Sequence, residues 1–159
     1  VLDRIRSGEF MVGVCTGSDI LEKDLQSEVL TREPMVIIPS GLIPIKFPDS
    51  GELPVISIED YSGAWRSFQD EVEKLRIRRQ VALESFFSVA LMAIAGFGHG
   101  MVPIGVALTL KIPEDCLINL EKKGLHRPVR FVARKSTYSL PIVSSFYQLL
   151  VSKLSTGLT

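Results

Sequence analysis

The feature that most constrains the fold is the alternation of short apolar segments with helical patterns along the chain. Residues 10–15, 54–58 and 128–134 have the length and apolar content of strands. Between such segments, apolar residues recur every three or four positions, as on the buried face of a helix. Strands that alternate with helices are typical of α/β layers. We therefore predict an α/β fold with a parallel sheet at its core.

Three segments show helical patterns. Residues 62–75 are predicted to form one amphipathic helix that the hydroxyl of Ser62 can cap. Residues 86–95 are apolar on almost every side, which predicts a helix buried in the core. The last helix is expected to open near Ser139. Residues 25–40 are predicted to form two strands or one long, bent strand.

Two segments interrupt this alternation and are candidate linkers. Residues 41–53 contain two prolines and two glycines, with Pro54 directly after them, and residues 113–115 form a second, shorter break. The two breaks divide the chain into three pieces. No internal repeat or low-complexity segment is present.

The charge balance bears on the kind of partner that this chain can hold. Eighteen basic and eighteen acidic side chains give a formal net charge of zero. A domain that bound nucleic acid by itself would need a basic excess to displace counterions from phosphates. With 46% hydrophobic and 23% charged residues, the composition is that of an ordinary globular protein.

No apolar run is long enough to cross a membrane and no signal peptide is recognisable, so we expect the protein to lie in the cytoplasm.

The residues that usually carry catalysis or bind metals are sparse. Cys15 and Cys116 have no metal-ligand spacing, and His99 and His126 are too far apart to suggest a site. Residues 96–100 hold three glycines, but a helix precedes them and a strand follows, the reverse of a dinucleotide-binding loop. No nucleophile, base and orienting acid stand out. We expect no catalytic residue, no metal and no cofactor.

Two positions nevertheless suit a ligand. Thr16, Gly17 and Ser18 follow a predicted strand, and the ends of strands in open α/β sheets bind ligands. Ser85 opens a predicted helix, where free amides attract anions. Each position also has a purely structural interpretation, since Ser18 can form a turn and Ser85 can cap its helix.

The order of these features resembles the effector-binding domains of LysR-type transcription regulators. Residues 2–15, LDRIRSGEFMVGVC, are similar to the family's helix, glycine and strand, with Met11 where the family often has aspartate. Residues 92–120 contain the pattern A-G-x-G-x-G-x-x-P-x-x-x-A, which resembles the family's most recognisable stretch. His99 stands in it where an apolar or small residue is more common. The resemblance covers nearly the whole chain.

The resemblance implies a fold of the periplasmic-binding-protein type, in which two Rossmann-like lobes are joined by two crossover segments. Lobe one would comprise residues 1–44 and 116–159, and lobe two residues 45–115. The family's first strand–helix–strand unit has no counterpart in the sequence, which implies an N-terminally truncated domain with an incomplete first lobe. The family's helix-turn-helix has no counterpart either, in agreement with the neutral charge.

The resemblance also implies the function. The chain would bind a small anionic effector between its lobes and modulate DNA binding by a separate helix-turn-helix domain, as part of a dimer or tetramer, without contact to membranes. The implied ligand contacts are Thr16, Gly17, Ser18, Ser40, Ser85, Phe86, Phe87, Gly98 and His99. Two alternatives share the lobes: a solute-binding protein of a transport system, and an enzyme such as a deaminase or dehydratase.

Overall fold

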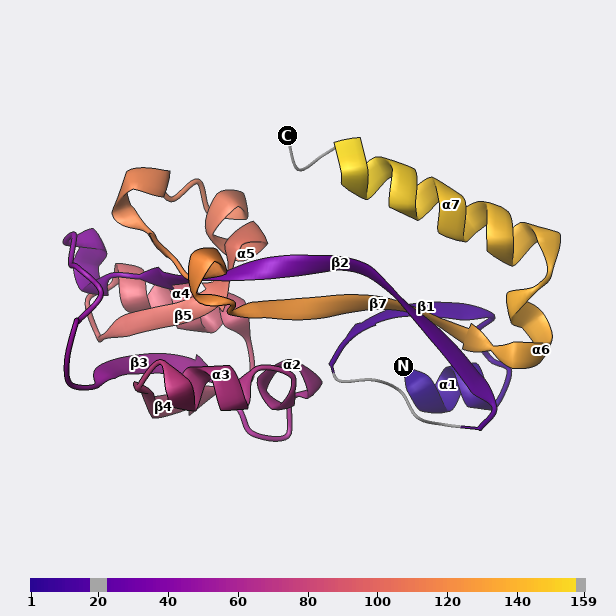
Figure 1. The fold of residues 1–159 in the computed structure, drawn as a ribbon, viewed down its shortest axis with the longest axis horizontal. Coiled ribbons are helices and arrows are strands. Elements are labelled where there is room, and N and C mark those ends of the chain that lie inside the picture. Colours follow the sequence, from indigo (N-terminus) through magenta and orange to yellow (C-terminus); the bar gives the residue numbers. More distant parts are fainter. Residues whose placement is uncertain (18–22, 157–159) are drawn as a thin grey trace. The chain divides into compact units, whose positions relative to one another are not determined.

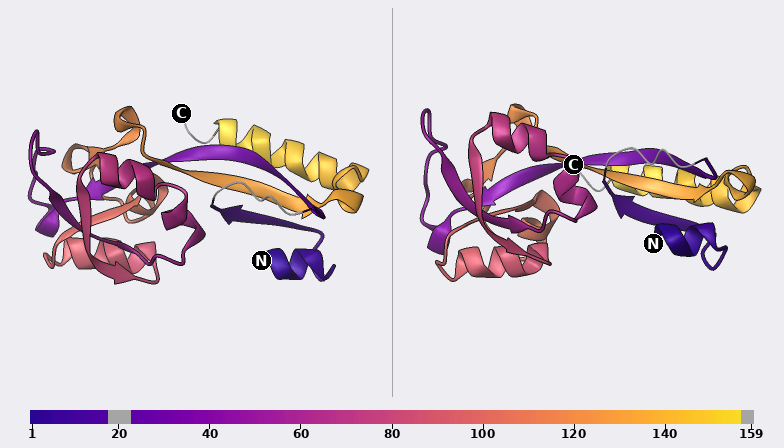
Figure 2. Two further views of the ribbon diagram at one scale, coloured as in Figure 1. Left: turned by 60° about the horizontal axis from the view of Figure 1, so that its bottom comes forward. Right: turned by 90° about the horizontal axis from the view of Figure 1, so that it is seen from below.

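The chain folds into two compact units. The computed structural model describes residues 1–17 and 23–156. The first unit combines Val1–Arg32 with Pro128–Thr159, and the second unit is Glu33–Arg127. The chain leaves the first unit along strand β2 (Leu25–Ile38) and returns along strand β7 (His126–Arg134), which can be followed in Figures 1 and 2. The predicted α/β class with two crossover segments is confirmed.

The unit boundaries differ from the predicted ones at residues 44/45 and 115/116. The proline-rich segment near residues 44–53 and the break at residues 113–115 both lie inside the second unit. The chain changes units within β2 and β7 instead. At each boundary a charged residue stands before a proline within a strand, Glu33 before Pro34 and Arg127 before Pro128, so neither is a glycine-rich or loop-like linker.

The second unit contains the parallel strands. Its strands besides β2 are β3 (Leu53–Ile58), β4 (Ile77–Leu83), β5 (His99–Pro103) and β6 (Ile118–Asn119). Strand β3 pairs in parallel with β4 and β5, whereas β2 pairs antiparallel with β5 and β6. The predicted parallel core is therefore correct for β3, β4 and β5 and wrong for β2, which enters this sheet in the opposite direction.

Strand β2 is a single continuous element, as one of the two predicted alternatives required. It runs for 14 residues, and its ladder with β5 begins at Met35, directly after Pro34. Proline has no amide hydrogen to donate, so a position before the ladder is where a strand tolerates it. Residues 35–38 are completely buried and form the centre of the core of the second unit.

Helices cover this sheet, and one predicted helix is divided. The helices of the second unit are α2 (Gly63–Arg66), α3 (Gln69–Lys74), α4 (Phe86–Ile94) and α5 (Ile104–Thr109). Ser62 caps α2 as predicted, since its Oγ accepts the N–H of Ala64 at 3.2 Å. The single helix predicted over residues 62–75 breaks at Phe68, whose φ of −139° and ψ of 6° are not helical. Phe68 is buried there, so the apolar spacing predicted burial correctly but not continuity.

Helix α4 is buried on one side only. Val89 and Ala93 are fully buried, whereas Phe87 and Leu91 are 46% and 56% exposed, so the prediction of all-round burial is wrong. The buried side lies against β5 at Gly100, where an added Cβ would come within 2.9 Å of the Cβ of Ala93. A glycine at this position lets helix and strand approach each other closely.

The first unit is built on antiparallel pairing. Its elements besides parts of β2 and β7 are α1 (Leu2–Arg6), β1 (Val12–Thr16), α6 (Lys135–Tyr138) and α7 (Pro141–Thr156). Strand β1 pairs antiparallel with β7, which corrects the parallel arrangement predicted for residues 10–15. Ile5 and Val132 are buried in one small cluster, and Phe131 and Val143 in another.

Among the described residues, no helix is long and apolar enough to span a membrane.

Candidate ligand-binding site

The candidate site lies in the second unit, at the edge where parallel strands β3 and β4 end. Ser85 follows β4 and is the N-cap of α4, with extended backbone angles and an Oγ that accepts the N–H of Phe87 at 3.2 Å. The predicted cap is therefore confirmed. Its hydroxyl hydrogen stays available to an acceptor, and the N–H groups of the first turn of α4 point toward the same edge.

Arg127 supplies a positive charge at this edge. Its guanidinium lies 5.4 Å from the centre of the Phe86 ring, a cation–π contact that joins β7 to the first turn of α4. The Phe86 ring is buried, whereas Phe87, the next residue, is half-exposed. The buried ring therefore provides a fixed apolar support for the guanidinium.

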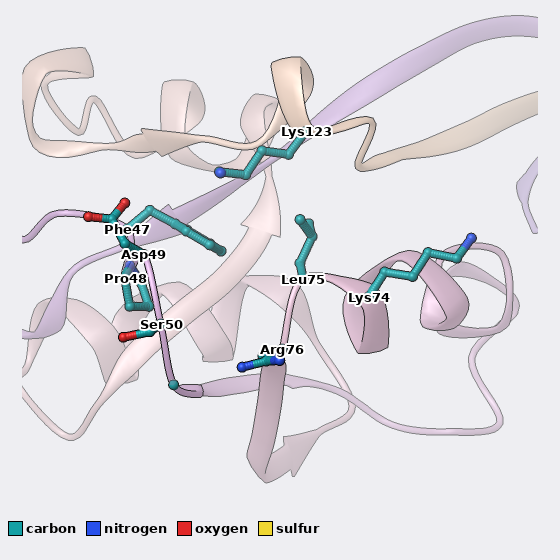
Figure 3. Close-up of a pocket in the computed structure, with 9 residues that line it drawn as sticks. Phe47, Pro48, Asp49, Ser50, Lys74, Leu75, Arg76 and Lys123 are labelled. Atoms are coloured by element: carbon teal, nitrogen blue, oxygen red, sulfur yellow. The ribbon is translucent and has the colours of Figure 1, made fainter.

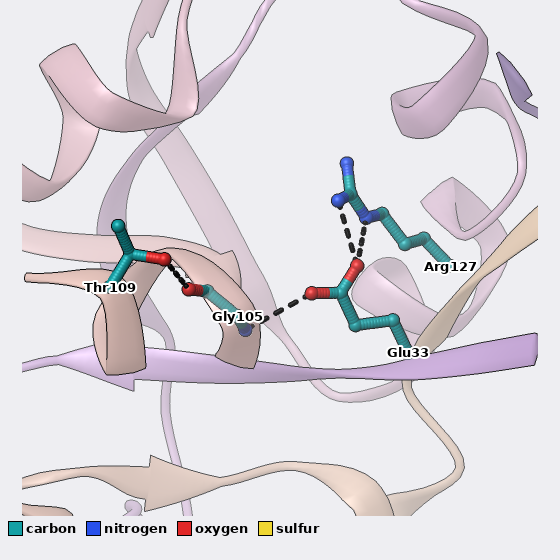
Figure 4. Close-up of polar contacts among 4 residues, drawn as sticks. All are labelled: Glu33, Gly105, Thr109 and Arg127. Atoms are coloured by element: carbon teal, nitrogen blue, oxygen red, sulfur yellow. Dashed lines mark hydrogen bonds and ion pairs between the residues drawn. The ribbon is translucent and has the colours of Figure 1, made fainter. Parts of the chain in front are cut away.

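Glu33 holds the guanidinium of Arg127 in place. Nε and Nη2 of Arg127 both lie 2.7 Å from Oε2 of Glu33, and the two side chains are only 20% and 16% exposed. The other carboxylate oxygen of Glu33 accepts the N–H of Gly105 in the first turn of α5 at 3.0 Å. Figure 4 shows these contacts, together with the 2.7 Å hydrogen bond from the hydroxyl of Thr109 to the carbonyl of Gly105.

This arrangement leaves one part of the guanidinium for a ligand. Glu33 engages Nε and Nη2, and Figure 4 shows the third nitrogen, Nη1, directed away from that carboxylate. A guanidinium fixed by a carboxylate on one side is a preorganised donor for an anion on the other.

A partly buried acid adds a second polar group at the same end of the sheet. Glu59 follows β3, and its N–H donates to the carbonyl of Leu83 at 3.1 Å. Its Oε2 is buried and has no hydrogen-bond partner among the described residues. A buried acceptor without a partner costs free energy, so this oxygen favours a ligand group that can donate a hydrogen bond.

The structure separates the predicted contacts of the second unit into two groups. Ser85, Phe86 and Phe87 lie at the beginning of α4, whereas Gly98 and His99 follow its end. A helix of nine residues is about 13 Å long, so the two groups do not share one small ligand.

His99 and Ser40 form a structural contact in that second group. The backbone N–H of Ser40 donates to Nδ1 of His99 at 3.0 Å, which ties the turn after β2 to the start of β5. A neutral imidazole that accepts at Nδ1 carries its proton on Nε2. Gly98 has a φ of +154°, and an added Cβ would lie 3.3 Å from the side chain of Ile56. Whether these residues also contact a ligand stays a prediction.

The remaining predicted contacts belong to the first unit. Thr16 ends β1 opposite Val129 of β7, and the buried Gly17 accepts a 3.2 Å hydrogen bond at its carbonyl from Nε of Arg130. Ser18 lies outside the described residues. Cys15 faces Arg130 across the strand pair, and burial raises the pKa of its thiol while the charge of Arg130 opposes that change.

Sequence reasoning missed Glu33 and Arg127, although each leaves a signal. Both are charged residues directly before a proline within a strand, Glu33 before Pro34 and Arg127 before Pro128. A charge in a strand interior needs a partner, and two such charges of opposite sign are candidates for an ion pair with each other.

Within the described part of the chain, no group of three or more His, Cys, Asp or Glu side chains could hold a metal ion.

Comparisons with known proteins agree on one family. The sequence model of the family described as "LysR substrate binding domain" matches residues 1–155. An uncharacterized HTH-type transcriptional regulator of Vibrio cholerae serotype O1 is 26% identical over 164 residues, which cover 97% of this chain and 51% of that protein. The chain thus spans about half the length of this curated relative.

Solved structures show the same fold at low sequence identity. The reduced form of the regulatory domain of OxyR2 from Vibrio vulnificus matches with a TM-score of 0.66 and 21% identity, over 96% of this chain and 76% of that one. The effector binding domain of QuiR in complex with shikimate matches with a TM-score of 0.71 and 15% identity, over 98% and 77% of the respective chains. Identities this low establish the fold and leave the ligand open.

Proposed function

Because the chain belongs to the family of LysR substrate binding domains, we propose that it is the effector-sensing domain of a bacterial transcription regulator. It binds a small anionic metabolite and thereby modulates DNA binding by a separate helix-turn-helix domain. The observation that carries this proposal is the Arg127 guanidinium, held by Glu33 and Phe86 beside the first turn of α4. The curated relative, an HTH-type regulator of twice the length, supports the link to DNA.

The chemistry of the edge favours a hydroxy acid or a similar small anion. The positive end of α4, the hydroxyl of Ser85 and Nη1 of Arg127 attract a carboxylate or phosphate. The unpaired oxygen of Glu59 favours a hydroxyl donor on the same ligand. QuiR was solved with shikimate, which is itself a hydroxylated carboxylate. The contacts proposed in the first unit are Thr16, Gly17 and Ser18.

Binding without turnover is part of the proposal. The relatives that the chain matches are transcription regulators, and the edge offers anion donors rather than a nucleophile with a general base. Such a regulator acts on DNA, so we place it in the cytoplasm.

The ligand-binding experiment is calorimetric titration of the chain with shikimate and with a panel of small hydroxy acids and phosphorylated acids. Arg127→Gln is expected to weaken binding of the best anion at least about tenfold, because one charged hydrogen bond contributes ~1.5–3 kcal/mol. Arg78→Gln is the matched control, because it removes an exposed arginine that pairs with Glu52 away from this edge, and it should retain binding. Equal losses in both variants, or no saturable binding by any anion, would refute the proposal.

A homo-oligomer is the second part of the proposal, supported by the exposed apolar side of α4. Phe87 and Leu91 project from one side of the helix, and Phe97, just after it, is 72% exposed. Exposed apolar groups of this size on a helix are typical of an interface. Leu91→Glu should shift the chain toward monomer in light scattering, while Thr109→Glu, on the exposed part of α5, should not. An unchanged mass for Leu91→Glu over a range of concentrations would exclude this face.

A further inference from the structure

A second pocket in the second unit lies at the end of the sheet opposite to the candidate site. It has a volume of about 390 Å³ and is formed by residues 47–51, residues 74–76 and Lys123 (Figure 3). Residues 47–51 precede β3, and residues 74–76 precede β4. Strand β3 has six residues at ~3.3 Å each, so about 20 Å separates this pocket from the edge near Arg127. The pocket is therefore independent of the proposed effector site.

The charges around this pocket are mostly positive and unpaired. Lys74, Arg76 and Lys123 line it together with one acid, the exposed Asp49. Among residues 1–17 and 23–156, none of the three cations forms an ion pair. Figure 3 shows Lys123 directed toward Phe47 and Lys74 directed away from it. The pocket thus offers Arg76 and Lys123 to an anion, with Lys74 adding to the field from outside.

Apolar groups complete the pocket. Nζ of Lys123 lies 4.2 Å from the centre of the Phe47 ring, which limits where the ammonium can go. Pro48 and Leu75 add further apolar surface. A volume in the range of small-molecule sites, with exposed cations beside a few apolar side chains, suits a small organic anion.

The backbone at Arg76 has a left-handed conformation beside the pocket. Arg76 lies two residues after the end of α3, with a φ of +54°, in the left-handed region where glycine is the usual residue. Its N–H donates to the carbonyl of Glu73, and its own carbonyl accepts the N–H of Leu53, both at 3.0 Å. A residue other than glycine costs about 1 kcal/mol in this conformation.

We propose that this pocket is a second, anion-binding site of the domain, which takes a small organic phosphate or polycarboxylate through Arg76 and Lys123. The site is exposed, so its affinity is expected to be modest and to fall with rising ionic strength. It would let the domain respond to a second metabolite besides the effector at the edge near Arg127.

Nuclear magnetic resonance titration of the isotope-labelled chain tests this site. Inorganic phosphate and citrate are added in separate titrations, and potassium chloride at equal ionic strength is the reference. The expected result is saturable shifts of the amides of Gly51, Leu75, Arg76 and Lys123 with phosphate or citrate only. Gly105, at the opposite edge, serves as the internal reference. Which probe saturates at the lower concentration distinguishes a phosphate site from a carboxylate site.

Two variants and a matched control make the test specific. Arg76→Gly removes the cation and relieves the backbone, so it should raise the melting temperature while weakening anion binding at least about fivefold. Lys111→Gly is the control, because Lys111 also has a left-handed φ, of +55°, after α5 but lies outside the pocket. It should raise the melting temperature and leave binding unchanged. Lys123→Gln should weaken binding without the gain in stability.

The outcomes separate clearly. The second site would be overturned if the amide shifts do not saturate or equal those in potassium chloride. It would also be overturned if Lys111→Gly weakens binding as much as Arg76→Gly does. Because none of these variants touches the edge near Arg127, binding of the effector stays unchanged in all three, and failure here leaves the proposed function intact.

Discussion

The ion pair between Glu33 and Arg127 is expected to be one of the strongest single contacts in the second unit. Replacement of Arg127 by leucine removes both hydrogen bonds to Oε2 and leaves the carboxylate of Glu33 with only the N–H of Gly105 as a donor. Breaking a buried pair by removal of one partner costs ~3–5 kcal/mol, and since Glu33 is 16% exposed we expect the lower end, about 3 kcal/mol.

The matched variants form a double-mutant cycle. Glu33→Leu should cost less than Arg127→Leu, because Arg127 then keeps its contact with Phe86 and can reach water through Nη1. The double variant carries no unpaired buried charge, so it should be more stable than the sum of the single effects predicts. We expect a coupling energy of about 2 kcal/mol between the two side chains.

Urea unfolding followed by tryptophan fluorescence is the appropriate assay. Trp65 is the single tryptophan of the chain and is buried in the second unit, so its emission reports on the unit that holds the pair. For a domain of this size, about 3 kcal/mol corresponds to a decrease of ~6–12 °C in melting temperature. A coupling energy below about 0.5 kcal/mol would show that the pair is an ordinary surface contact and would refute the reasoning.

Three further predictions follow from single contacts. Gly100→Ala should lower the stability of the second unit by about 1–3 kcal/mol in the same fluorescence assay, because the new methyl group overlaps Ala93; no loss would mean that helix and strand are not in close contact. Ser85→Ala should cost about 1 kcal/mol through the lost cap, and Ser85→Asp should restore it, again by urea unfolding. In a Cys116→Ala background, Cys15 should react with iodoacetamide at pH 8 more slowly than free cysteine, because burial raises the pKa of its thiol and only the thiolate reacts. The rate should rise through and above pH 9, and a rate equal to that of free cysteine would contradict this.

Much of the fold could be predicted because burial follows periodicity. The apolar spacing of residues 62–75 identified Trp65, Phe68 and Val72 as buried side chains, although a non-helical Phe68 divides the segment into two helices. Ser62 and Ser85 were recognised as caps because a hydroxyl before a helix has one common use. The strand direction in the first unit could not be predicted, since pairing with β7 depends on a segment more than a hundred residues away.

The candidate site was predicted less completely than the fold, for a physical reason. Ser85 and Phe86 could be proposed as ligand contacts because the start of a helix after a strand is a local pattern. Glu33 and Arg127 are 94 positions apart, and only the folded chain brings them together. The link between Ser40 and His99 is also a contact between distant segments, and it explains a histidine where the resemblance implied a small residue.

The pair formed by Glu33 and Arg127 has a consequence for how such proteins diversify. Glu33 is the first residue of the second unit and Arg127 is the last, so the two ends of this unit meet at a 2.7 Å contact. A segment whose two ends lie close together can be exchanged as one piece, because the flanking chain can connect to both ends without additional residues. Transplanting residues 33–127 between homologous domains should therefore carry over the anion-binding groups near Arg127, with the ion pair to Glu33 closing the junction.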